Sequence, residues 1–170
     1  MGAYRRYLLG ELGLGAGLLN VALNGAIAYV MFRGAESVPF SGSRSISADL
    51  AGTAFFLPFF TTLVVTPLTR RRASREGWNP PSTPPAVAAA LRLVPDTVVR
   101  RALLLGFLTL AFVAVPTLWA LAWAGVSELS TGGFVRFKSV FAGILGAVLT
   151  PLAGYLALFD GTPTGRAQPG

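Results

Sequence analysis

Residues 8–32 read LLGELGLGAGLLNVALNGAIAYVMF, and this stretch decides the fold class. It holds one charged residue, Glu11, and it is longer than the roughly 20 residues that an α-helix needs to cross the hydrocarbon core of a bilayer. Segments 47–68, 98–124 and 134–159 meet the same criterion. Because these apolar runs are continuous, they do not fit the short alternating strands of a membrane barrel. The sequence predicts an all-α membrane protein, a bundle of four transmembrane helices.

The composition indicates that lipid is the solvent. Only 12% of the 170 residues are charged, whereas soluble domains have roughly 25%. A small soluble core also cannot bury several apolar runs of this length. We assign residues 1–160 to a single transmembrane domain. The tail, residues 161–170, is expected to be disordered because polar residues, Gly and Pro dominate it.

The basic residues predict the orientation of the bundle. Ten of the 14 Lys and Arg residues flank the termini and the loop at residues 69–97, and the other two loops share the remaining four: Arg33, Arg44, Arg136 and Lys138. The positive-inside rule then places both termini and the long loop in the cytoplasm of a bacterial inner membrane. Within that loop, the apolar run at residues 86–94 is too short to span, so we expect an interfacial helix there.

A weak internal repeat relates the two halves of the chain. Ala26-Ile27-Ala28-Tyr29 corresponds to Ala120-Leu121-Ala122-Trp123, and Thr66-Pro67-Leu68 corresponds to Thr150-Pro151-Leu152. Each half would hold two helices, so the copies would be parallel repeats about an axis along the membrane normal. The alternative is chance similarity within an alphabet dominated by Ala, Leu, Val and Phe.

Small and polar residues recur at spacings of three and four in the first segment, as one stripe: Gly10, Gly13, Gly17, Asn20 and Asn24. A second stripe in the fourth segment includes Gly143 and Gly146. Small residues let two membrane helices approach closely, so the simplest bundle packs the first helix against the fourth along these stripes. In the alternative arrangement, one stripe faces a second copy of the protein.

Four residues could form a polar path through the bilayer. Asn20 and Asn24 either bond across a helix interface or line a pocket near the midplane, since intramembrane polar groups often mark a substrate route. Pro58 and Pro116 lie near the middle of the second and third helices, where each frees a backbone carbonyl. The simpler interpretation of the prolines is that Pro is common in membrane helices.

A charged group is expected at the outer ends of the second and fourth helices. Asp49 follows Ser47, and a Ser cap with an acid in the first helical turn would suit the helix dipole. Alternatively, Asp49 pairs with Arg44, Arg136 or Lys138. Together with two helix N-termini, these bases could then attract an anion.

The residue inventory argues against enzymatic chemistry. The chain has no His and no Cys, so the commonest general base and the commonest transition-metal ligands are missing. No Gly-rich phosphate loop or metal-ligand cluster occurs, so no catalytic residue, metal or cofactor is expected. The net charge of +7 lies mostly beside the apolar segments, so the expected partner is the lipid bilayer and not nucleic acid.

Several short motifs together resemble a group of small, uncharacterised bacterial inner-membrane proteins with four helices. The motifs are Leu19-Asn20, Asn24-Gly25-Ala26-Ile27-Ala28, Val38-Pro39, Ser45-Ile46-Ser47 with Asp49, Phe56-Leu57-Pro58-Phe59, Thr66-Pro67-Leu68, Phe134-Val135, Phe137-Lys138 and Leu149-Thr150-Pro151-Leu152. Some members of the group carry the label permease. The resemblance implies transport, without a substrate or a catalytic residue.

Two classes of function follow from these patterns. The first is a small permease or channel subunit, expected to form a homo-oligomer because four helices make a thin wall. The second is a structural or accessory subunit that packs against a partner membrane protein through its glycine stripes.

Overall fold

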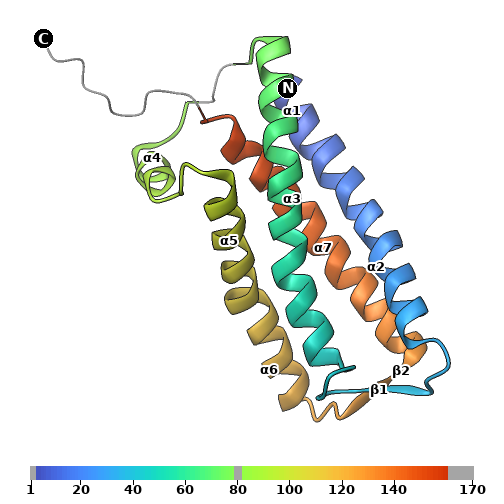
Figure 1. Cartoon of the computed structure of the whole chain (residues 1–170). Helices are drawn as coiled ribbons and strands as arrows, with labels where there is room; N and C mark the ends of the chain where they lie inside the picture. Colours follow the sequence, from blue (N-terminus) through green and yellow to red (C-terminus); the bar gives the residue numbers. More distant parts are fainter. Residues whose placement is uncertain (1–2, 79–81, 161–170) are drawn as a thin grey trace, which may run out of the picture.

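The computed structural model describes residues 3–78 and 82–160. Within them, four helical spans are long and apolar enough to cross a membrane: Tyr4–Phe32, Ile46–Glu76, Val98–Trp123 and Thr131–Ala157. The spans form one elongated bundle (Figure 1). The structure confirms the all-α fold class and the four-helix membrane bundle, so the chain is an integral membrane protein.

Each span is built from consecutive helical elements. The first joins α1 (Ala3–Arg6), the π-helical η1 (Tyr7–Gly15) and α2 (Ala16–Phe32), and the second is α3 (Ile46–Glu76). The third joins α5 (Val98–Thr109), the π-helical η2 (Leu110–Ala114) and α6 (Val115–Trp123), and the fourth is α7 (Thr131–Ala157). The predicted tail, residues 161–170, lies outside the described residues.

Large apolar side chains cover the outside of the bundle. Leu14, Leu18 and Phe112 are 70%, 71% and 73% exposed. Such surfaces are stable against lipid tails and would be costly in water. Their position on two different spans agrees with a bundle that is surrounded by a bilayer.

Two of the expected helix ends were wrong. We expected the second helix to end at Leu68, but α3 continues through Pro67 to Glu76. The fourth helix, expected to reach Phe159, ends as α7 at Ala157 with Pro151 inside it. Pro is tolerated inside membrane helices because neighbouring groups satisfy the freed backbone atoms. The N-cap of α3 is Ser45 and not Ser47: the Ser45 side chain accepts a hydrogen bond from the Ala48 N–H at 3.2 Å.

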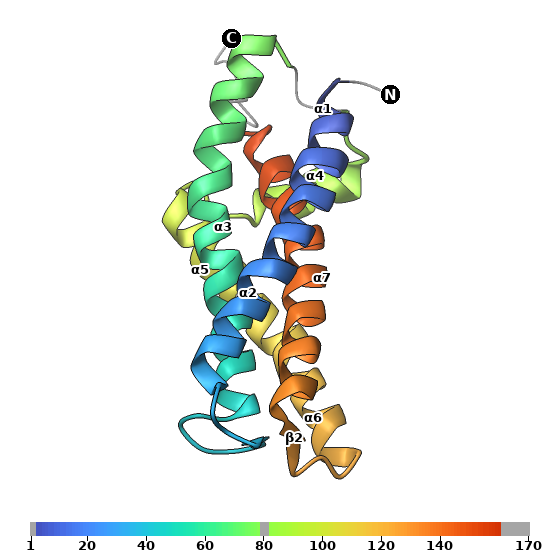
Figure 2. The same cartoon turned by 90° about the vertical axis from the view of Figure 1, so that its right-hand side faces the viewer.

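The fourth span lies at the centre of the bundle. α7 packs against α2 and η1 on one side and against α3 on the other, while α5 packs on α3. In the most apolar 18-residue stretch of the fourth span 50% of the residues are buried, compared with 11% in the corresponding stretch of the first span. Figure 2 shows α2 and α7 running side by side. Because α7 lies between them, α2 and α3 make little direct contact, and this separation creates the site described below.

A short strand pair ties two loops together at one end of the bundle, which we call the strand end. β1 (Ser37–Pro39) and β2 (Glu128–Ser130) are antiparallel, with Val38 opposite Leu129. The main hydrophobic core lies just beneath them. There, the Phe32 and Phe134 rings meet edge to face with their centroids 5.1 Å apart.

The two halves of the chain share local features that agree with an internal repeat. Gly34 and Gly125, each two residues after a span, both have positive φ, at 89° and 74°. Ser45 and Ser130 each cap the following helix by accepting a hydrogen bond from the N–H three residues on. The packing of the first span on the fourth is matched by the packing of the third on the second.

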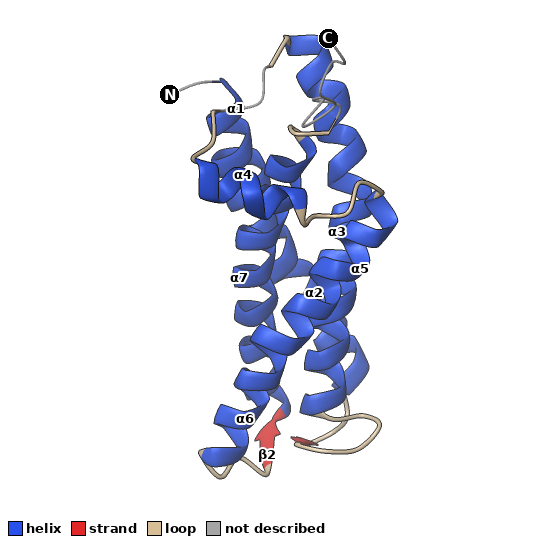
Figure 3. Ribbon diagram, turned by 90° about the vertical axis from the view of Figure 1, so that its left-hand side faces the viewer, coloured by secondary structure: helices blue, strands red, loops and turns tan. Residues whose placement is uncertain are grey.

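The opposite end, which we call the terminal end, carries α1 and α4 (Pro85–Arg92). α4 lies crosswise to the spans (Figure 3) and has no buried residue. Its position and length fit the short interfacial helix expected at residues 86–94; it begins one residue earlier, at Pro85 in the first helical position, and ends at Arg92.

Candidate functional site

A groove of about 710 Å³ runs between α2 and α3, with α7 as its floor. It begins at the strand end, beside Phe32 and the loop residues Ser43, Arg44 and Ser45, and it extends to Val65 of α3. Its volume lies in the range of roughly 300–1,000 Å³ that is typical of small-molecule sites. The groove exists because α7 keeps α2 and α3 apart.

Asn20 and Asn24 both line the groove. Asn20 Nδ2 donates to the Ala16 carbonyl oxygen at 2.9 Å, and Asn24 Nδ2 donates to Asn20 Oδ1 at 3.2 Å. The two amides therefore bond along their own helix. One of the sequence interpretations had them bond across a helix interface instead. Each side chain amide has two N–H groups, so Asn24 keeps donor capacity beside the groove.

A buried ion pair lies at the strand end of the groove. Lys138 Nζ on α7 contacts Asp49 Oδ1 on α3 at 2.5 Å, and the two side chains are only 4% and 8% exposed. Both residues line the groove. The second carboxylate oxygen, Asp49 Oδ2, is buried without a hydrogen-bond partner among the described residues. A buried acceptor without a donor is costly, so this oxygen calls for an explanation.

The other two bases of the predicted charged group differ in position. Arg44 donates to the carbonyl oxygen of Met31 and lies 5.9 Å from the centroid of the Phe32 ring. It therefore reaches from the start of α3 to the end of α2, across the mouth of the groove. Arg136 is exposed and is not among the residues that line the groove. The structure thus brings Arg44, Asp49 and Lys138 together and leaves Arg136 outside.

Polar contacts between the first and second spans close the groove toward the terminal end. Arg72 forms an ion pair with Glu11 at 2.5 Å, and Tyr7 Oη lies 3.3 Å from Thr69 Oγ1. The Arg72 guanidinium also lies 4.4 Å from the centroid of the Tyr7 ring. The gap between the first and second spans is therefore closed by η1 and α3 toward the terminal end.

The glycine stripes lie mostly where the first span meets the fourth. A Cβ at Gly17 would lie 3.0 Å from Ala147 Cβ and 3.3 Å from the Gly143 carbonyl oxygen. A Cβ at Gly146 would lie 3.1 Å from the Ala16 carbonyl oxygen, and Gly13 is also close to Ala147. Gly10 differs: it is exposed, and a Cβ there would meet nothing within 4 Å. Gly10 is therefore outside this helix contact.

The two prolines of the expected polar path do not reach the groove. Pro58 is buried in α3, and its carbonyl oxygen accepts a hydrogen bond from Thr62 Oγ1 at 2.7 Å. Pro116 is exposed on the lipid side of α6, directly after the wider turns of η2. The carbonyls that these prolines free belong to Ala54 and Phe112, four residues earlier in each helix, and neither residue lines the groove.

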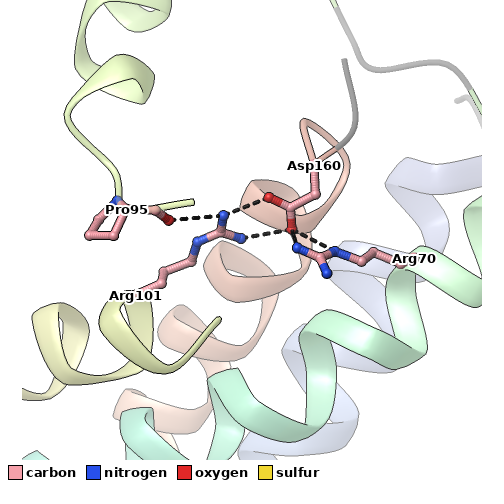
Figure 4. Close-up of polar contacts among 4 residues, drawn as sticks. All are labelled: Arg70, Pro95, Arg101 and Asp160. Carbon is pink, nitrogen blue, oxygen red and sulfur yellow. Dashed lines mark hydrogen bonds and ion pairs between the residues drawn. The ribbon is translucent and has the colours of Figure 1, made fainter. Parts of the chain in front are cut away.

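Sequence reasoning missed a charged cluster at the terminal end, drawn in Figure 4. Asp160 accepts hydrogen bonds from Arg70 Nε at 2.8 Å and from Arg101 Nη2 at 2.6 Å, and Arg101 Nη2 also donates to the Pro95 carbonyl oxygen at 3.3 Å. Arg101 is only 3% exposed. The cluster joins the ends of α3, α5 and α7. The clue in the sequence was Asp160 itself, an acid placed directly after the last span on the arginine-rich side.

The described residues contain no group of three or more His, Cys, Asp or Glu side chains that could hold a metal ion. No protein-family model, curated protein or solved structure matches the chain. The site must therefore be interpreted from its own geometry.

Proposed function

We propose that this protein is a small permease component of a bacterial inner membrane, and that its substrate is an amphipathic molecule that enters the groove sideways from the bilayer. The observation that carries the proposal is the arrangement of the groove: it lies between two spans, and its charged residues, Arg44, Asp49 and Lys138, gather at the strand end. A molecule dissolved in the membrane can reach such a site without crossing water. The charge distribution favours a cytoplasmic terminal end, so the strand end would face outward.

The lining favours a lipid-soluble substrate over a stream of ions. Along most of its length the groove is bordered by large apolar side chains, among them Leu19, Leu23, Phe56 and Phe60. Water-filled paths need polar groups along their length, since the hydrocarbon region offers no other hydrogen-bonding partner. We therefore prefer the permease interpretation to the channel interpretation, with the Asn20–Asn24 pair as a polar patch in an otherwise apolar site.

The accessory-subunit hypothesis has one observation of its own. The first span is the least covered of the four, with 11% of its most apolar window buried, and Gly10 leaves open space on its surface. A helix of a partner membrane protein, or of a second copy, could pack on this face. In that case the groove would be filled by protein and closed to lipid.

Filling the groove tests the proposal. Gly52 lines the groove and a Cβ there would meet nothing within 4 Å, so Gly52→Leu adds a side chain without a clash in the fold. We expect photolabelling of α2 and α3 by a phospholipid with a diazirine in its acyl chain to fall about tenfold in liposomes, since steric exclusion of this kind costs on the order of one decade in affinity. Peptide mapping by mass spectrometry gives the readout.

Gly10→Leu is the matched control, because it makes the same change at an open, lipid-facing glycine away from the groove. Labelling near Phe112, an exposed residue of the third span, reports ordinary surrounding lipid. Equal labelling of α2 and α3 in both variants would mean that no lipid enters the groove. Absence of lipid together with a stable protein partner would support the accessory-subunit hypothesis instead.

A further inference from the structure

We infer that the groove selects a phospholipid whose headgroup carries both a phosphate and an N–H or O–H donor, such as an ethanolamine or a glycerol headgroup. The inference rests on the proposed function, since it names the substrate class for the same groove. It follows from three features: an excess of positive charge at the strand end, a carboxylate oxygen there without a partner among the described residues, and an apolar groove beside them that is long enough for an acyl chain.

The positive charge favours an anionic group at the mouth. Two cations, Arg44 and Lys138, and one anion, Asp49, line this end of the groove, so one positive charge is in excess. The N-terminus of α3 begins next to Arg44, at Ile46, and adds the positive end of a long helix dipole. Arg44 is exposed and presents several N–H donors beyond the one used on Met31. A phosphate matches this arrangement of donors.

Asp49 adds a demand that a phosphate alone cannot meet. Oδ1 is held by Lys138 at 2.5 Å, whereas Oδ2 is buried and has no donor among the described residues. The terminal torsion of a carboxylate is broad and two-fold, so a modest rotation keeps Lys138 on one oxygen and presents the other to the groove. A headgroup ammonium or hydroxyl would supply the missing hydrogen bond. A trimethylammonium group has no N–H and would not.

The groove is long enough for an acyl chain. From Asp49 to Val65, both of which line it, α3 advances sixteen residues, which corresponds to about 24 Å at 1.5 Å per residue. One leaflet contributes about 15 Å of hydrocarbon, half of a core of about 30 Å. A lipid with its headgroup beside Arg44 could therefore lay one whole chain between α2 and α3.

The experiment is a competition in detergent micelles with the full-length protein. The probe is phosphatidylethanolamine with a diazirine in one acyl chain, and the readout is its crosslinking to α2 and α3. The competitors are unlabelled phosphatidylethanolamine, phosphatidylglycerol, phosphatidylcholine and a free fatty acid with the same chains. We expect the first two to displace the probe at concentrations about tenfold lower than the last two, because each of those lacks either the donor or the phosphate.

A pair of arginine variants checks the phosphate contact. Arg44→Gln should raise the phosphatidylethanolamine concentration that displaces half of the probe about tenfold. Arg136→Gln removes an exposed arginine from the same end of the bundle, outside the groove, and should leave it unchanged. Size-exclusion chromatography of both variants in mild detergent verifies that each keeps the fold, because Arg44 also contacts Met31 and Phe32.

The outcomes separate this inference from the proposed function. Equal displacement by phosphatidylcholine, or equal behaviour of the two arginine variants, would overturn the headgroup selectivity and leave a groove that binds acyl chains of any lipid. No crosslinking of α2 and α3 by the probe would overturn the proposed function, and the headgroup inference with it.

Discussion

Asp49→Asn is expected to destabilise the fold by about 3–5 kcal/mol, the range measured when one partner of a buried ion pair is removed. Lys138 is only 4% exposed as a side chain, and Asp49 is the acid with which it pairs. Without the carboxylate, the ammonium is left as an uncompensated charge beneath the strand end. Unfolding in a titration with sodium dodecyl sulfate, followed by tryptophan fluorescence, measures the loss.

The double variant Asp49→Asn/Lys138→Met should recover most of this loss, because it removes both charges and keeps similar volumes. Glu128→Gln makes the same acid-to-amide change at an exposed site on β2, so its effect should stay within about 0.5 kcal/mol. If the double variant were as unstable as the single one, Lys138 would not be the reason for the loss. The ion-pair assignment would then be wrong.

Gly146→Leu is expected to be similarly damaging, at about 3 kcal/mol, the upper end of the usual cost of overpacking. Its Cβ would lie 2.5 Å from Asn20 Nδ2 and 3.1 Å from the Ala16 carbonyl oxygen. Asn20 can move, but the backbone of the first span can move only if the span leaves α7. The same titration measures the stability, and size-exclusion chromatography in mild detergent reports whether the variant stays folded.

Gly10→Leu is the control here as well, since it puts the same side chain into open space on the first span. We expect it to be close to the unmodified protein, because surface substitutions away from contacts stay within about 0.5 kcal/mol. Equal destabilisation by both variants would indicate that leucine disturbs the first span by itself. In that event, the role assigned to Gly146, which is to allow close contact between α2 and α7, would be wrong.

Local patterns were sufficient to predict the helices of this fold. Continuous apolar runs fix four spans, and the spacing of Gly13, Gly17, Gly143 and Gly146 anticipates which two spans meet, because close approach requires small residues on both partners. The charges at positions 44, 49 and 138 could be grouped in advance: with four antiparallel spans, the loop after the first span and the loop after the third span lie on the same side of the membrane. These features depend on periodicity and connectivity, both of which are visible in a sequence.

The groove itself could not be predicted, because it depends on which spans do not touch. Nothing in α2 or α3 alone says that α7 holds them apart. The pairing of Glu11 with Arg72 was equally hidden, because it requires α3 to continue beyond Leu68, and Pro67 had suggested an end there. The partners of Asn20 and Asn24 were also open, since an amide bonds equally well along its own helix or across to another.

One measurement tests the central claim that lipid, and not water or protein, fills the space between α2 and α3. The chain contains no cysteine, so a single Thr61→Cys places one spin label in the groove, far along α3 from the strand end. In liposomes we predict frequent collisions with dissolved oxygen and few with a water-soluble nickel chelate, as for a label at the lipid-exposed Phe112. Strong collisions with the nickel chelate would reveal an aqueous path, and protection from both reagents would reveal a groove filled by protein. Either result would contradict the account.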